Sequence, residues 1–189
     1  MYTTETKLSI NGNIVVFQRN GDTDITLLEK HNKFQAGGLA AIINCLAYGT
    51  TISHIAMLYS SASSPSAIGA SGGTLTWADF VSRGSASGNG LILCPAFMIG
   101  VSEKLAQGGT STGINNSASF VGLSDSGELV CGSQLATGNK VFAIGLVQKA
   151  VPTITSSNNI LYAAADITAI SKAANSQIGV RWTTTITVS

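Results

Sequence analysis

The sequence predicts a mainly β protein, an antiparallel β-sandwich of jelly-roll-like form with one short helix near residues 36–47. About ten short segments are rich in apolar, β-branched and aromatic residues, as strands are. Turn signals made of Gly, Asn, Ser and Pro separate these segments at the spacing that is typical of sandwiches. Beyond residue 50 the connections are too short for crossover helices, which favours antiparallel pairing.

The N-terminal region reads as short strands and turns. Residues 7–18 predict two strands around Asn11-Gly12-Asn13, because Asn-Gly is a strong hairpin signal. A polar turn at residues 19–24 and a further strand follow. We expect residues 1–30 to form an N-terminal hairpin or arm, a candidate docking segment, and residues 31–189 to form the sandwich domain.

A helical pattern follows the N-terminal region. Apolar residues recur there at intervals of three and four: Leu39, Ile42, Ile43, Leu46 and Ala47. Gly49 follows as a stop signal. The polar side of this segment lacks Lys and Arg, which argues against a helix that lies on a membrane. We expect a helix over residues 36–47 that packs against a sheet.

The strand pattern returns after Gly49. Residues 52–60 predict an apolar strand, and residues 61–74 predict a low-complexity loop with Ser, Gly and Pro65. Residues 75–83 alternate between apolar and polar positions, which predicts another strand. Residues 91–102 predict a strand that lies at an edge or bulges at Pro95, because proline lacks the N–H that a ladder requires.

The last third of the chain predicts further hairpins. Residues 106–118 read as a long polar loop, and Asp125 to Glu128 read as the turn of a hairpin. Residues 178–188 form the clearest amphipathic strand of the sequence. Its predicted buried face consists of Ile178, Val180, Trp182, Thr184, Ile186 and Val188.

Charged side chains are scarce in this chain. They make up 10% of its residues, whereas soluble domains usually carry about 25%. The formal net charge of +1 is far from the basic balance of a nucleic-acid-binding protein. The first residues lack the pattern of a secretory signal, and no apolar stretch has the length of a membrane span. We expect a soluble protein, made in the cytosol, that packs against other proteins.

The cysteine pattern does not predict a metal site. Cys45, Cys94 and Cys131 lie among apolar or small residues, and none belongs to a C-x-x-C pair. We expect them to be small buried side chains, with a single disulfide as the alternative. The sequence predicts no metal and no cofactor.

One short segment matches a motif of serine hydrolases. Residues 69–73 match G-x-S-x-G around Ser71, but that motif requires a strand before the serine and a helix after it. A serine-rich loop precedes Ser71, and the segment that follows predicts a strand. His31 lies in a polar run and His54 in an apolar strand, so we expect a solvated and a partly buried histidine. We therefore predict no catalytic residue.

The remaining acids and aromatics also favour structural roles. Asp22 and Asp24 begin like a calcium loop, but the rest of an EF-hand does not follow. The carboxylate pair of a glycosidase meets only in space, so sequence spacing does not exclude one. Trp77 and Trp182 both fall on apolar strand positions, which predicts core packing rather than an exposed platform for sugars.

The order of several segments resembles small structural proteins of tailed bacteriophages. The segments are HNKFQAGGLAAIINCLAYGT at 31–50, ISHIAMLYSS at 52–61, GLSDSGEL at 122–129 and ISKAANSQIGVRWTTTITV at 170–188. A loop rich in Ser, Pro, Ala and Gly follows the second segment, as it does in that family. The resemblance covers residues 31–189.

The resemblance implies a virion protein without catalytic residues. The expected function is that of a capsid decoration or cement protein, a homotrimer on the exterior of the capsid that bridges subunits of the major capsid protein. Such a protein is made in the host cytoplasm and binds neither nucleic acid nor membrane. We expect residues 1–30 and the loops at 61–74 and 106–118 to make the contacts.

Two other functions remain open at this point. A tail, fibre or baseplate module that binds host surface glycans or other tail proteins would present an exposed aromatic patch. A small hydrolase would use Ser71 with a histidine and an acid nearby, or a pair of carboxylates.

Overall fold

The computed structural model describes residues 8–34, 52–70, 73–103, 114–149 and 159–188. Within them the predicted antiparallel β-sandwich is confirmed, with ten strands in two sheets of five. The helix predicted over residues 36–47 lies outside the described residues. Residues 106–113 of the loop predicted at 106–118 also lie outside them, and the loop prediction is wrong for residues 114–118, which belong to a strand.

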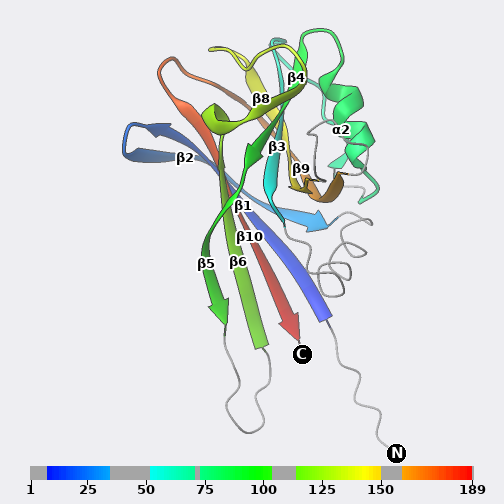
Figure 1. Ribbon diagram of the computed structural model, residues 1–189, viewed down its shortest axis with the longest axis vertical. Coiled ribbons are helices and arrows are strands. Elements are labelled where there is room, and N and C mark those ends of the chain that lie inside the picture. Colours follow the sequence, from blue (N-terminus) through cyan, green and yellow to red (C-terminus); the bar gives the residue numbers. More distant parts are fainter. Residues whose placement is uncertain (1–7, 35–51, 71–72, 104–113, 150–158, 189) are drawn as a thin grey trace, which may run out of the picture.

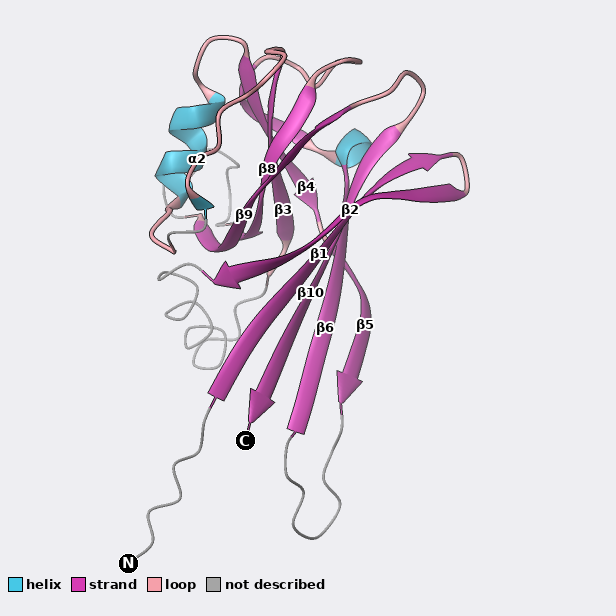
Figure 2. Ribbon diagram, turned by 180° about the vertical axis from the view of Figure 1, so that it is seen from behind, coloured by secondary structure: helices cyan, strands magenta, loops and turns pink. Residues whose placement is uncertain are grey.

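Sheet A has the strand order β5-β6-β10-β1-β2, and sheet B has the order β9-β8-β3-β4-β7. The strands of sheet A are β1 (Leu8–Asn20), β2 (Thr23–Phe34), β5 (Phe97–Glu103), β6 (Ile114–Leu123) and β10 (Gln177–Val188). Those of sheet B are β3 (His54–Ser60), β4 (Asn89–Pro95), β7 (Glu128–Gly132), β8 (Lys140–Gln148) and β9 (Ile160–Ser171). The end of β2 pairs with β9 and connects the two sheets. The long strands of sheet A extend well past sheet B (Figures 1 and 2).

Sheet B is covered on both faces. One face packs against sheet A through a core that includes Ile14, Ile55 and Trp182. The other face carries a second cluster, which includes Leu58, Phe80 and Phe142 and lies under helix α2 (Trp77–Gly84). Strands buried on both faces read as continuous apolar runs rather than alternating ones. This explains the unbroken hydrophobic sequences of β3, β4 and β8.

The strand predicted over residues 75–83 is wrong, because this segment forms α2. The Thr76 hydroxyl accepts a hydrogen bond from the Asp79 backbone N–H, and the Asp79 carboxylate accepts one from the Thr76 N–H. This capping box satisfies donors at the helix start. Trp77, Phe80 and Gly84 then share the buried side of the helix, at spacings of three and four.

The hairpin predicted at Asn11-Gly12-Asn13 is also wrong. Strand β1 continues through these residues, and the turn lies at Gly21 and Asp22, inside the polar stretch at 19–24. Gly12 is buried, and a Cβ atom there would come within 1.6 Å of Asn32 Oδ1. This glycine therefore permits a close approach of β1 and β2 rather than a turn.

The strand predicted over residues 91–102 is divided in two at the proline. Pro95 ends β4 in sheet B, and β5 begins at Phe97 in sheet A. Strand β7 pairs with β4 only from Gly90 to Leu93, so the ladder on that side does not need the missing N–H of Pro95. At the position where we predict an interrupted ladder, the chain thus crosses from sheet B to sheet A.

A second passage replaces the hairpin predicted at Asp125. A short 3₁₀ turn (Ser124–Ser126) carries the chain from β6 in sheet A to β7 in sheet B, and these two strands do not pair. The buried Ser124 hydroxyl accepts a hydrogen bond from the Ile178 N–H at 3.0 Å. The turn is thereby attached to the start of β10.

The C-terminal strand is confirmed, and the first half of its predicted buried face is buried, whereas Thr184 is half-buried and the side chains of Ile186 and Val188 are not described. Ile178, Val180 and Trp182 of β10 are buried in the core between the sheets. Strand β1 lies between β10 and β2, so the boundary predicted at residue 30 falls inside β2 and marks no break in the described sheet.

Candidate docking surface

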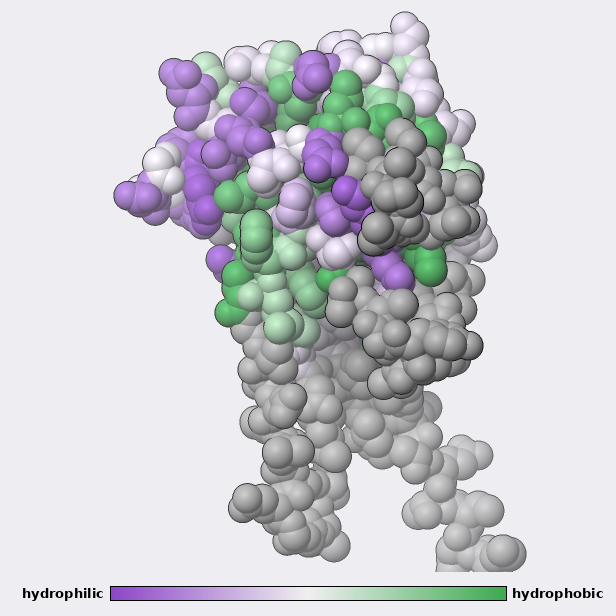
Figure 3. Space-filling view, viewed as in Figure 1, coloured by the Kyte–Doolittle hydropathy of each residue, from purple (hydrophilic) through white to green (hydrophobic). Residues whose placement is uncertain are grey.

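Strand β5 forms an open edge of sheet A, with β6 as its neighbour in the described sheet. Three consecutive apolar residues on it are exposed, Phe97 at 66%, Met98 at 61% and Ile99 at 55%. We call these residues the edge patch. Figure 3 shows hydrophobic side chains gathered over this part of the molecule. The free side of an edge strand presents backbone N–H and C=O groups that bind another strand.

The opposite edge of the strand order, β7, is protected. It has only five residues and begins with the exposed Glu128, which forms an ion pair with Lys149 at 3.5 Å. Helix α2 also contacts it, since the Cys131 thiol donates a hydrogen bond to the Val81 carbonyl at 3.5 Å. Short length, charge and cover are the usual protections of an edge. The edge patch carries no charge.

A bulge lies within the edge patch. The register between β5 and β6 shifts between Met98 and Gly100, so Ile99 is an extra residue. Such a bulge bends an edge strand and redirects side chains. The sequence does not predict this patch, because a run of apolar residues without alternation is equally typical of a buried strand.

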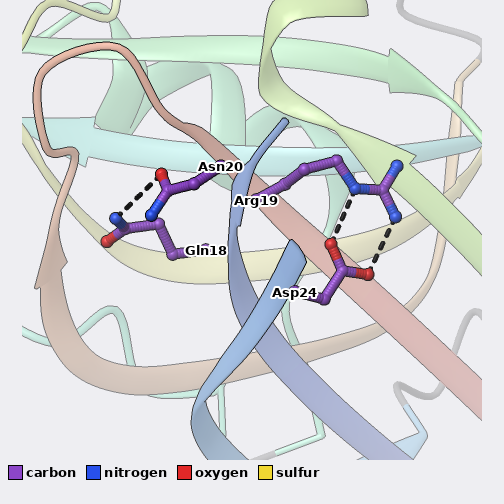
Figure 4. A network of polar contacts seen from close by, with 4 residues as sticks. All are labelled: Gln18, Arg19, Asn20 and Asp24. Atoms are coloured by element: carbon purple, nitrogen blue, oxygen red, sulfur yellow. Dashed lines mark hydrogen bonds and ion pairs between the residues drawn. The ribbon is translucent and has the colours of Figure 1, made fainter. Parts of the chain in front are cut away.

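The β1–β2 hairpin carries a polar cluster near its tip. Arg19 Nε and Nη2 donate to the two carboxylate oxygens of Asp24 at 2.7 and 2.8 Å, and Gln18 donates to Asn20 at 3.2 Å (Figure 4). The hydrogen bond from Arg19 lowers the pKa of Asp24 and raises the pKa of Arg19. The Asp24 carboxylate is thus paired with the Arg19 guanidinium. Within the described ranges, no three His, Cys, Asp or Glu residues gather in a way that would hold a metal.

A small pocket of about 240 Å³ lies where β2 and β9 meet. Lys30, His31 and Asp166 contribute to its lining, together with Ala70. The Asp166 carboxylate accepts hydrogen bonds from the backbone N–H groups of Ile68 at 2.7 Å and Ala70 at 2.8 Å. Both oxygens of this carboxylate therefore fasten the loop that follows β3.

The context of the serine motif differs from that of a hydrolase. Ser71 lies outside the described residues, but its neighbour Ala70 lines the pocket that His31 and Asp166 also line. Strand β3 ends at Ser60 and α2 begins at Trp77, so the described flanks are not the tight strand–turn–helix of a nucleophile elbow.

The second histidine of the sequence, His54, is the first residue of β3. His54 is half-buried, and its Nδ1 lies 2.8 Å from the Ser53 hydroxyl. Burial lowers the pKa of His54, and the nearby Lys149 lowers it further. It therefore favours the neutral form, as expected for a partly buried histidine.

The described cysteines are free thiols. Cys94 is buried, and burial raises its pKa to about 12. Cys131 is partly buried beside α2. Cys45 lies outside the described residues. A thiol with a raised pKa carries little thiolate and is a poor nucleophile, which agrees with the predicted role of Cys94 as a small buried side chain.

Both tryptophans pack in the interior. Trp77 lies in the cluster under α2 and Trp182 in the core between the sheets. The predicted core packing is confirmed, although Trp77 is on a helix rather than on a strand. These two rings therefore do not form an exposed platform for sugars.

Comparisons with protein-family models, with curated proteins and with solved structures found no match to this chain. None of the helices among the described residues has the length and hydrophobicity that crossing a membrane requires.

Proposed function

We propose that this protein is a non-enzymatic structural component of a tailed-phage virion, a decoration protein that binds the exterior of the capsid. The observation that supports this proposal most is the exposed edge patch on a protein with few charged residues. An exposed apolar surface is stabilised when an assembly covers it. The resemblance of residues 31–189 to virion proteins suggests that this assembly is a phage particle.

The polar groups of the described pocket support a structural role. Asp166 directs both carboxylate oxygens at backbone N–H groups, and the Lys30 ammonium donates to the Asp166 carbonyl at 2.6 Å. A general base must instead be free to accept a proton from a substrate. These contacts hold the loop at residues 61–70 against the sandwich.

The mechanism of a decoration protein is physical. Contacts that span neighbouring capsomers must break before the capsomers separate, so bound protein stabilises the shell by mass action. The edge patch, the fastened loop at residues 61–70 and the β1–β2 hairpin are the surfaces that we assign to the capsid. The homotrimer expected from the resemblance stays a prediction.

Capsid particles that lack this protein provide the test. Purified protein added back should sediment with the particles and raise the temperature at which they release DNA. An antibody label should then lie over the shell in electron micrographs. Label on the tail would instead favour the tail module, and a protein that neither binds particles nor changes DNA release would contradict the proposal.

A further inference from the structure

We infer that the β1–β2 hairpin contains a site of spontaneous deamidation at Asn20, which Gly21 follows. The Gly21 amide nitrogen bonds to Cγ of Asn20 and closes a succinimide ring, and the reaction is intramolecular because the two residues are adjacent. The Cγ–Nδ2 bond breaks, and the side-chain amide leaves as ammonia with the proton of the Gly21 N–H. Water then opens the ring at either carbonyl, which leaves aspartate or isoaspartate at residue 20. This modification goes beyond the proposed capsid binding and does not depend on it.

The chain contains three Asn-Gly pairs, at residues 11–12, 20–21 and 89–90. Glycine favours the attack because it has no Cβ beside its nitrogen and because its backbone adopts many conformations. The sequence alone does not rank the three pairs. The structure ranks them, since ring closure requires a glycine N–H outside the ladders and room for the two residues to rotate.

Two of the pairs are held inside the sheets. Gly12 is buried in the middle of β1, with β10 on one side and β2 on the other. Gly90 is buried in β4, between β3 and β7. The Asn89 side chain also donates a hydrogen bond to the Arg83 carbonyl at 3.0 Å. Both pairs must therefore open locally before they react.

The pair at Asn20 lies at the tip of the hairpin, where both residues are exposed. The ladder between β1 and β2 ends with Asn20 opposite Thr23, so Gly21 lies in the turn beyond it. The φ angle of Gly21 is +58°, and no atom lies within 4 Å of the place that a Cβ would occupy. The Gly21 nitrogen is thus outside the ladder, in a turn with open space around it.

The side chain of Gln18 assists the reaction. Its Nε2 donates a hydrogen bond to Oδ1 of Asn20 at 3.2 Å (Figure 4). Attack at Cγ places negative charge on Oδ1, and a donor aimed at that oxygen stabilises the charge, as in an oxyanion hole. The contact engages the oxygen and not Nδ2, the nitrogen that departs.

The product changes the charge of the hairpin tip. A carboxylate at residue 20 joins Asp22 and Asp24 there and takes the formal net charge of the chain from +1 to zero. Isoaspartate also adds one carbon to the main chain at the end of β1. Ion exchange therefore separates the altered chain from the original one.

Incubation of the full-length protein at mildly alkaline pH, in water enriched in heavy oxygen, tests the inference. Peptide mass spectrometry should find the label at residue 20, as aspartate and isoaspartate. The rate there should exceed the rates at Asn11 and Asn89 about tenfold or more, because those pairs react only through local opening. In guanidinium chloride the three rates should agree within about threefold, since the fold no longer distinguishes them. In Asn20→Ser the shift on ion exchange should disappear.

A variant of Gln18 tests the assistance. Gln18→Leu should slow the reaction at Asn20 about threefold in the folded protein, because the charge on Oδ1 loses its donor. In guanidinium chloride it should react like the wild type, which is the matched control. A folded Gln18→Leu that reacts as fast as the wild type would contradict the role of Gln18. Absence of label at residue 20 in the folded wild type, or equal rates at the three pairs, would overturn the inference as a whole.

Discussion

The aromatic ring of Phe17 in β1 covers Gly179, its partner across the ladder in β10. A Cβ atom at Gly179 would come within 2.2 Å of Phe17 Cζ. The ring is buried, and the guanidinium carbons of Arg19 and Arg181 lie 5.4 and 5.9 Å from its centroid. Because Gly179 has no side chain, the Phe17 ring lies directly over it. The guanidinium groups of two arginines pack against this ring.

Gly179→Ala should destabilise the fold, because the added methyl group displaces the Phe17 ring. Overpacking of this kind costs about 1–3 kcal/mol, which urea denaturation would measure. In a Phe17→Ala background the same substitution should cost less than about 1 kcal/mol, because the obstacle is gone. Equal costs in the two backgrounds would show that the ring is not the cause.

Thr76→Ala should weaken the start of α2. Loss of an N-cap side chain costs about 1 kcal/mol, measured as a lower free energy of unfolding. Ser82→Ala is the control, since Ser82 is an exposed residue within the same helix and alanine is favoured there. If the two variants unfold alike, the capping box contributes nothing.

The same cap predicts an acid dependence. Hydrogen bonds from the Thr76 backbone and hydroxyl lower the pKa of Asp79 below its ordinary value of 3.8. A carboxyl group with a lowered folded-state pKa stabilises the fold above pH 3.8, and this contribution is lost as the pH falls through the folded-state value. Asp79→Asn should therefore destabilise the protein at neutral pH and have little effect in strong acid, as denaturation at both values would show.

Mild acid should act on His54. Its pKa is lowered from 6.5, chiefly by burial, so the folded state binds a proton less readily than the unfolded chain. Stability should then fall as the pH drops below 6.5. His54→Asn should flatten the dependence of the melting temperature on pH. An identical slope in the wild type and in His54→Asn would rule out His54 as its source.

Asp166→Asn should release the loop that follows β3. The amide keeps one acceptor oxygen and brings an N–H₂ group toward backbone donors, and hydrogen bonds to a charged group contribute about 2 kcal/mol. Hydrogen exchange at the amides of Ile68 and Ala70 should accelerate. Lys30→Met changes the same pocket without touching the carboxylate, so those amides should stay protected in it. Unchanged exchange in Asp166→Asn would refute the role of the carboxylate.

Periodicity predicted most strands but failed where two patterns overlap. Residues 75–83 alternate well enough for a strand, yet Trp77, Phe80, Val81 and Gly84 also have helical spacing. The deciding signal was Thr76 with an acid at Asp79, the pattern of a capping box. Local hydrogen bonds at the start of the segment thus outweighed the alternation within it.

Glycine and proline were recognised as special positions, but their roles depend on distant parts of the chain. Gly12 resembles a turn residue until Asn32 of the neighbouring strand is placed beside it. Pro95 was expected to interrupt a ladder, whereas the sheet that receives the next strand is set by β6. A single sequence does not show such partners, because they are far away along the chain.

The exposure of the edge patch could not be predicted from the sequence for the same reason. Phe97, Met98 and Ile99 have the composition of core residues, and their pattern predicts only a strand. Their exposure follows from the place of β5 at the end of the strand order. That place is a property of the whole topology and not of the segment itself.

The pairing of β1 with β10 has a consequence for synthesis on the ribosome. These strands pair from Leu8 with Val188 to Arg19 with Gln177, so the first and the last of the described strands lie side by side. Until β10 has left the exit tunnel, the middle of sheet A has no ladder, and β1 and β6 each lack a neighbour. Pairing between such distant segments is slow and exposes nascent chains to aggregation, so sheet A closes only after the whole stretch from β1 to β10 has been synthesised.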